Sequence, residues 1–125
     1  MSSGPTILVI EDDRLMRESV AGALRAAHFT VIEAEDGEVG LALALEKHPD
    51  LVILDVAMPK LDGVSVMRQM RADPWGAKAL IVLLTSLSDS DFVNKEVLEY
   101  KPAYCLKKGS LSLDEVIDRV KVLVL

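Results

Sequence analysis

The chain has 125 residues, 50% hydrophobic and 27% charged, and its 20 acidic residues against 14 basic ones give a formal net charge of −6. An acidic chain with 4% aromatic residues lacks the basic stripe and aromatic surface that nucleic-acid binding uses, so we expect no direct contact with DNA or RNA. Cys105 is the single cysteine and cannot form an intrachain disulfide, and no apolar run reaches the ~18 residues of a membrane span. We therefore expect a cytoplasmic protein without membrane contact, folded as one domain over residues 1–125 with a flexible N-terminus at 1–5.

Five short apolar runs, rich in β-branched residues, predict strands at 7–10, 30–32, 51–54, 80–84 and 104–106. Most lack polar alternation, which is typical of parallel strands covered on both faces by helices. Helical spacing of apolar residues between and after these runs predicts helices near 16–27, 39–45 and 88–98, and from about 113 to the C-terminus. Ser112 and Glu115 match a capping box at the start of the last helix.

The alternation of strand and helix along the chain predicts an α/β fold with a doubly wound, five-stranded parallel sheet. The right-handed crossover rule leaves few topologies, and we expect strand order 2-1-3-4-5. Ligands of such sheets bind at the carboxyl ends of the strands. Functional residues should therefore follow the predicted strands directly.

Carboxylates follow the first and third predicted strands. Glu11, Asp12 and Asp13 end the first, and Asp55 ends the third. If these strands are neighbours, Asp12 and Asp55 converge, and two carboxylates ~4 Å apart repel by about 4 kcal/mol at an effective dielectric of 20, which calls for a cation or a proton. Mg²⁺ prefers a few carboxylates, waters and a phosphate, and is the predicted ion. Asp13 is better explained as a helix N-cap.

Hydroxyl and ammonium groups follow the last two predicted strands, at Thr85-Ser86 and Lys107-Lys108. Beside a metal ion, they would complement the charge of a transferring phosphoryl group. Asp55 is then the natural nucleophile, because a carboxylate that attacks phosphorus forms an acyl phosphate. The residues at the strand ends thus predict a phosphoryl site.

Four segments in this order and spacing resemble the receiver domains of two-component response regulators: ILVIEDD at 7–13, LVILDVAMPKLDG at 51–63, IVLLTS at 81–86 and AYCLK at 103–107. The resemblance implies a flavodoxin-like (βα)5 receiver domain over 1–125 that accepts a phosphoryl group from a histidine kinase or histidine phosphotransfer protein. Such a domain is no enzyme beyond its own phosphorylation and dephosphorylation. Phosphorylation would switch the surface of the fourth helix, fifth strand and fifth helix, where a downstream protein, an output domain or a second copy of the chain would bind.

The resemblance also implies a role for each matching residue. Asp55 would be the phosphoacceptor, and Mg²⁺ would be held by Asp55, by Asp12 directly, by Glu11 through water and by the backbone carbonyl of Ala57. The remaining matches are Thr85 as the hydroxyl that moves onto the phosphate, Lys107 as the phosphate-binding lysine and Tyr104 as the aromatic that fills the space Thr85 vacates.

Two departures from the family pattern leave alternatives open. Lys108 stands where a proline commonly follows the lysine, so Lys108 is an alternative for the lysine that reaches the site. Ala57 replaces a common polar side chain, which puts the lifetime of a phosphoryl group in question. A phosphatase of the haloacid-dehalogenase type would need a second acid at Ala57, which is absent. A degenerate receiver that docks partners regardless of phosphorylation is the other alternative.

Overall fold

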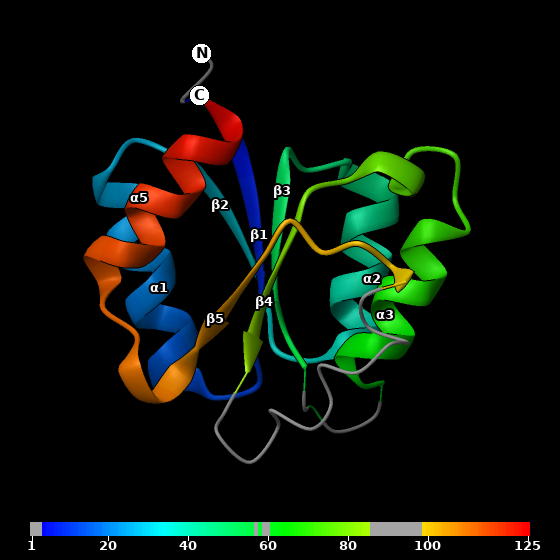
Figure 1. The fold of residues 1–125 in the computed structure, drawn as a ribbon, viewed down its shortest axis with the longest axis horizontal. Coiled ribbons are helices and arrows are strands. Elements are labelled where there is room, and N and C mark those ends of the chain that lie inside the picture. Colours follow the sequence, from blue (N-terminus) through cyan, green and yellow to red (C-terminus); the bar gives the residue numbers. More distant parts are fainter. Residues whose placement is uncertain (1–3, 57, 59–60, 86–98) are drawn as a thin grey trace.

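A five-stranded parallel sheet forms the centre of the computed structural model, which describes residues 4–56, 58, 61–85 and 99–125 (Figure 1). The strand order β2-β1-β3-β4-β5 confirms the predicted order 2-1-3-4-5. Each predicted strand is present with its bounds extended or shifted by one or two residues: β1 (Thr6–Ile10), β2 (Thr30–Ala34), β3 (Leu51–Asp55), β4 (Ile81–Thr85) and β5 (Tyr104–Lys107).

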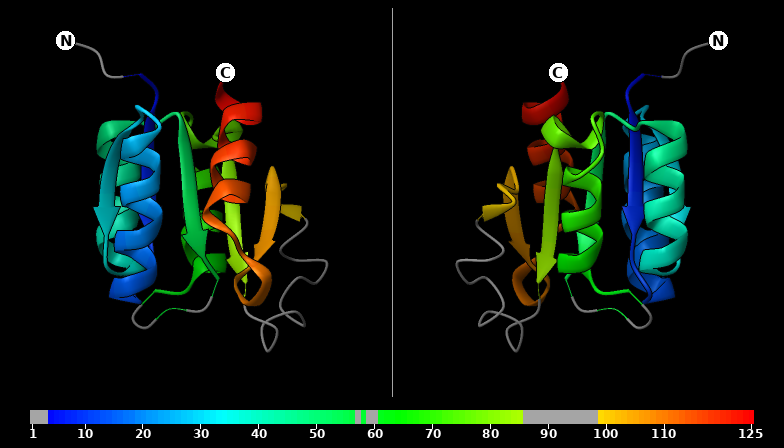
Figure 2. Two further views of the ribbon diagram at one scale, coloured as in Figure 1. Left: turned by 90° about the vertical axis from the view of Figure 1, so that its left-hand side faces the viewer. Right: turned by 90° about the vertical axis from the view of Figure 1, so that its right-hand side faces the viewer.

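Helices cover both faces of this sheet, as predicted for its apolar strands. The described α-helices are α1 (Arg14–Ala26), α2 (Gly37–Lys47), α3 (Gly63–Arg71) and α5 (Leu113–Val124), and short 3-10 helices lie at Gly76–Lys78 and Lys108–Ser110. Figures 1 and 2 show α1 and α5 side by side on one face and α2 and α3 on the other. The helix predicted near 88–98 lies outside the described residues. No described helix combines the length and hydropathy that a membrane crossing needs.

Side-chain caps set where the helices begin. The Asp13 carboxylate accepts a hydrogen bond from the Met16 amide at 3.2 Å, so Asp13 is the N-cap of α1, as predicted. Ser112 Oγ accepts from the Glu115 amide at 3.1 Å and caps α5, which confirms that half of the predicted capping box. Because α1 begins directly after Asp13, the two acids before it are held in the short turn between β1 and α1.

Two apolar cores lie on opposite faces of the sheet, and they reveal where each strand-end residue points. Ile53 packs in the core beneath α1 and α5, whereas Leu83 packs in the core beneath α2 and α3. Successive side chains of a strand alternate between faces. Asp55 therefore shares the α1/α5 face with Ile53, and Thr85 shares the α2/α3 face with Leu83.

Candidate functional site

Three of the predicted acids meet at the carboxyl ends of the central strands. Strands β1 and β3 are neighbours, with Ile10 opposite Leu54, so Glu11, Asp12 and Asp55 emerge side by side. One carboxylate oxygen from each lies within 4.8 Å of the others. Glu11 and Asp55 are buried, with exposed fractions of 0% and 1%, and Asp12 is open to solvent. The expected acidic crevice is therefore present in the fold.

The ammonium group in this crevice belongs to Lys108 rather than to Lys107. Lys108 Nζ lies 2.6 Å from Glu11 Oε1 and 3.1 Å from Asp55 Oδ2. Lys107 is the exposed last residue of β5, opposite Thr85. The role of Lys107 stays a prediction, and Lys108, the alternative that the sequence left open, is the lysine whose ammonium pairs with the acids in this structure. Lys108 is the first residue of the short 3-10 helix (Lys108–Ser110) that directly follows β5.

Burial and mutual repulsion dominate the electrostatics of the three acids. Burial, reinforced by the neighbouring Asp55, raises the pKa of Glu11 to about 8. Burial and Asp55 also raise the pKa of Asp12. Burial disfavours the charged form of Lys108, but its hydrogen bonds and ion pairs with Glu11 and Asp55 outweigh this and raise its pKa. The crevice thus holds more negative charge than one ammonium neutralises, and it favours a proton or a further cation.

The donor set fits a hard divalent ion. Glu11 Oε2 is buried, and no described residue donates a hydrogen bond to it. A buried carboxylate oxygen without a donor is costly unless a cation or a proton meets it. Carboxylate oxygens are the protein ligands that Mg²⁺ prefers, and the exposed side of Asp12 leaves access for waters of its shell. Ala57, the expected carbonyl ligand, lies outside the described residues.

Thr85 ends β4 on the strand next to Asp55, and its exposed fraction is 3%. The structure thus places the predicted hydroxyl at the same edge of the sheet as the acids. The residue of the neighbouring strand β5 that lies opposite Thr85 is Lys107. Tyr104 does not share this face, because it lies opposite Val82 in the α1/α5 core and stacks under Arg119, whose Cζ is 3.8 Å from the ring centroid. The exchange of space between Thr85 and Tyr104 on phosphorylation stays a prediction.

Gly63 packs directly against the backbone of Asp55 and Val56. Its amide donates to the Val56 carbonyl at 2.9 Å, and a Cβ at this position would come within 2.8 Å of Val56 Cα and closer still to the Asp55 carbonyl. We expect Gly63→Ala to displace the backbone of Asp55 and to lower the free energy of unfolding by about 2 kcal/mol, measured by urea denaturation. Gly22→Ala is the control because nothing lies within 4 Å of a Cβ there, and an equal loss in both variants would contradict this explanation.

The raised pKa of Glu11 makes the stability of the metal-free protein depend on pH. The folded chain holds the Glu11 proton up to about pH 8, against an ordinary pKa of 4.5. The stabilisation by this proton is full below pH 4.5 and is lost as the pH rises through about 8. In EDTA we expect the free energy of unfolding to fall by a few kcal/mol from about pH 5 to pH 8, at about 1.4 kcal/mol per pKa unit.

Urea denaturation across this pH range in EDTA checks the prediction. Glu11→Gln cannot lose a proton here, so we expect this variant to be more stable than the wild type at pH 8 and to show a flatter profile. A Glu11→Gln profile as steep as that of the wild type would assign the pH dependence to another group.

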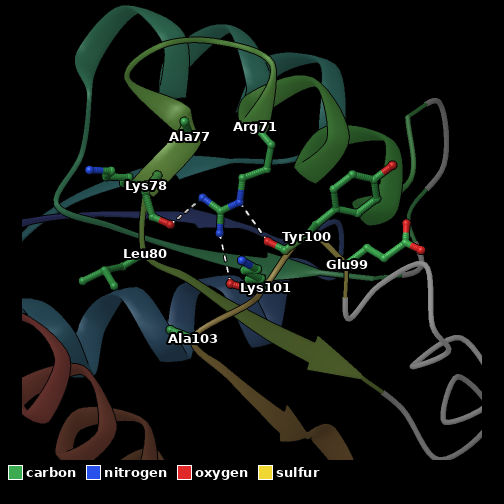
Figure 3. Close-up of a pocket in the computed structure, with 9 residues that line it drawn as sticks. Arg71, Ala77, Lys78, Leu80, Glu99, Tyr100, Lys101 and Ala103 are labelled. Atoms are coloured by element: carbon green, nitrogen blue, oxygen red, sulfur yellow. Dashed lines mark hydrogen bonds between the residues drawn. The ribbon is translucent and has the colours of Figure 1, made fainter.

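A hollow of about 460 Å³ lies at the opposite edge of the sheet, before the starts of β4 and β5 (Figure 3). Figure 3 shows Arg71 reaching across it to the backbone carbonyls of Tyr100 and Lys101, at 2.8 and 3.2 Å. Arg71 also donates to the carbonyls of Gly76 and Ala79, each at 2.7 Å. Through these hydrogen bonds, the Arg71 guanidinium joins α3 to the segment before β5. The hollow lies at the end of the sheet opposite the acids.

Comparisons with known proteins agree with the fold. The family model described as response regulator receiver domain matches residues 7–121. The DNA-binding dual master transcriptional regulator RpaA of Synechocystis is 40% identical over 83 residues, which are 66% of this chain and 34% of RpaA. The chain therefore matches about a third of the length of that relative.

Solved structures give the same fold. The Francisella response regulator 1452 receiver domain is 26% identical, with a TM-score of 0.84 and 97% of each chain covered. The chemotaxis protein CheY4 of Vibrio cholerae is 22% identical, with a TM-score of 0.86, over 96% of this chain and 98% of CheY4.

Proposed function

Because this chain belongs to the family of response regulator receiver domains of two-component systems, we propose that it accepts a phosphoryl group on Asp55 from a histidine kinase or a histidine phosphotransfer protein. The observation that carries this proposal is the convergence of the buried Asp55 with Glu11, Asp12 and the Lys108 ammonium. Receiver domains are signalling modules rather than an enzyme family, so membership argues against the phosphatase alternative.

The transfer proposed for Asp55 is a substitution at phosphorus. A carboxylate oxygen of Asp55 forms a bond to phosphorus while the bond from phosphorus to the donor nitrogen breaks, and the electron pair of that bond stays on the donor imidazole. The product is an acyl phosphate. Burial of Asp55 excludes water around its carboxylate, which favours attack by the carboxylate itself.

Glu11, Asp12 and Asp55 are the residues that would hold Mg²⁺, with the carbonyl of Ala57 as the proposed fourth protein ligand. The ion, when bound, would neutralise charge on the phosphoryl oxygens. Glu11 Oε2, which accepts no hydrogen bond from the described residues, and the exposed position of Asp12 support this assignment.

Lys108 is the proposed phosphate-binding lysine in place of Lys107. Its ammonium already lies within ion-pair distance of Asp55. When a phosphoryl group is joined to Asp55, the same ammonium can turn from the carboxylates to a phosphoryl oxygen without leaving the crevice. Lys107, on the face of Thr85, is then free to contact partners at the end of β5.

Phosphorylation adds nearly two negative charges and three acceptor oxygens at Asp55, at the end of the strand next to that of Thr85. We propose that the Thr85 hydroxyl donates to one of these oxygens and that the surface around β5 and α5 changes as a result. A downstream protein, an output domain or a second copy of the chain would bind the changed surface. A partner shifts this equilibrium only by its difference in affinity for the two shapes.

Intact-mass spectrometry tests the proposal most simply. We expect the chain to gain one phosphoryl group from acetyl phosphate in Mg²⁺ and none in EDTA. A chain that gains no phosphoryl group from acetyl phosphate or from a set of phosphorylated histidine kinases would contradict the proposal and would favour the phosphorylation-independent docking module.

A further inference from the structure

Arg17 connects helix α1 to the backbone beneath the acidic crevice, although no sequence motif marks it. Its Nη1 donates a hydrogen bond to the backbone carbonyl of Glu11 at 2.8 Å. The Arg17 side chain is 14% exposed, so this bond is largely shielded from water. A shielded bond from a guanidinium to a carbonyl is stronger than a neutral one, because the donor is charged.

The Glu11 peptide is thereby held from two sides. Its amide donates to the Ala34 carbonyl at 3.1 Å, which continues the pairing of β1 with β2, and its carbonyl accepts from Arg17. Asp12 follows Glu11 directly and is exposed. The direction of the Asp12 carboxylate therefore depends on a peptide that Arg17 fixes.

Glu33 of β2 holds Arg17 in this position. Glu33 Oε1 lies 3.5 Å from Arg17 Nε, while Glu33 Oε2 lies 3.0 Å from Arg25 Nη1. Arg25 also donates to the Val31 carbonyl at 3.2 Å, which lies away from the crevice. The two arginines thus share one carboxylate, but of these two side chains only that of Arg17 donates a hydrogen bond to the Glu11 carbonyl, within the part of the chain that the structure describes.

We propose that Arg17 is a positioning residue of the metal site, which acts by fixing the Glu11 carbonyl and so the direction of the Glu11 and Asp12 carboxylates. This inference rests on the proposed function, since it assumes that these carboxylates bind a divalent ion. Residues that orient metal ligands through hydrogen bonds typically contribute about tenfold or more to metal affinity.

The test measures binding of Mn²⁺, which shares the oxygen-ligand preference of Mg²⁺, by electron paramagnetic resonance of the free ion. Arg17→Met keeps the apolar stem and removes the donors, and we expect it to weaken Mn²⁺ binding by about tenfold. Arg25→Met is the matched control, because it removes the other partner of Glu33, and we expect its affinity to change less than about twofold. Arg17→Lys keeps one donor group and should recover part of the loss.

Thermal unfolding of each variant in EDTA separates this role from a purely structural one. A positioning role predicts that Arg17→Met loses far more metal affinity than Arg25→Met even where the two lose similar stability. Equal affinities of the wild type and Arg17→Met, or equal losses in the two arginine variants, would overturn the inference alone. If Arg17→Met does not fold, Arg17→Lys carries the same comparison. Absence of Mn²⁺ binding by the wild type would overturn the metal site itself.

Discussion

The Asp55→Asn chain is expected to gain no phosphoryl group from acetyl phosphate and yet to be more stable than the wild type in EDTA. The amide cannot act as the nucleophile, so the loss of labelling should be complete. Asp55 is 1% exposed, and one of its oxygens lies within 4.8 Å of a carboxylate oxygen of Glu11 and of Asp12. Removing its charge relieves their repulsion, and we expect the free energy of unfolding to rise by about 1 kcal/mol.

Intact mass after incubation with acetyl phosphate and Mg²⁺, together with urea denaturation in EDTA, measures both effects. The opposite signs exclude unfolding as the cause of lost labelling. Asp13→Asn is a matched control, because Asp13 caps α1 beside the crevice and asparagine also caps helices well. Normal labelling of Asp55→Asn would contradict the assignment of Asp55, whatever its stability.

Lys108→Ala is expected to slow phosphorylation by about a hundredfold, the scale of losing one charge-stabilising donor, whereas Lys107→Ala should stay close to the wild type. Lys108 Nζ is the ammonium that pairs with both Glu11 and Asp55. Without the Lys108 ammonium, the buried carboxylates of Glu11 and Asp55 lose this ion pair in the metal-free crevice. We therefore also expect Lys108→Ala to lose about 3 kcal/mol of unfolding free energy in EDTA.

Rates of phosphorylation at saturating Mg²⁺ and urea denaturation in EDTA provide the comparison. Lys107→Ala is a close control, since it removes the same group one residue earlier from an exposed position. Added Mg²⁺ should offset part of the stability lost in Lys108→Ala, because the ion replaces the missing positive charge. A larger loss of rate in Lys107→Ala than in Lys108→Ala would reverse the assignment of the two lysines.

The sheet and the convergence of the acids could be predicted from the sequence, because both depend on the order of apolar and acidic residues along the chain. Apolar runs mark the strands, and carboxyl ends of parallel strands meet at one edge. Glu11, Asp12 and Asp55 come directly after such runs, so adjacency of β1 and β3 was enough to bring them together.

The face of the sheet to which each β5 side chain points could not be predicted in the same way. A shift of one residue along a strand moves every side chain to the other face, and the apolar run at 104–106 contains no polar alternation to fix its direction. The packing of Leu106 against the α1/α5 core decides it. The same choice places Tyr104 beneath Arg119. Lys108 lies beyond β5, in the 3-10 helix Lys108–Ser110, so the strand pattern could not decide which lysine pairs with Asp55.

The contact of Arg17 with the Glu11 carbonyl could not be predicted from the sequence either. Its bond to the Glu11 carbonyl crosses six positions and depends on the path of the backbone between β1 and α1. A side chain that binds a backbone carbonyl requires no particular partner residue, so no pair of residue types marks such a contact.

Localisation of the phosphoryl group within the chain tests the central claim most directly. Borohydride reduces an acyl phosphate but leaves phosphate esters intact, so a phosphorylated aspartate becomes a residue with a terminal hydroxyl that tandem mass spectrometry can locate. After treatment with acetyl phosphate and Mg²⁺, we predict this change at Asp55 and at none of the other acids of the crevice. Reduction at Glu11 or Asp12 instead, or no reduced residue in a chain that carries the label, would contradict Asp55 as the phosphoacceptor.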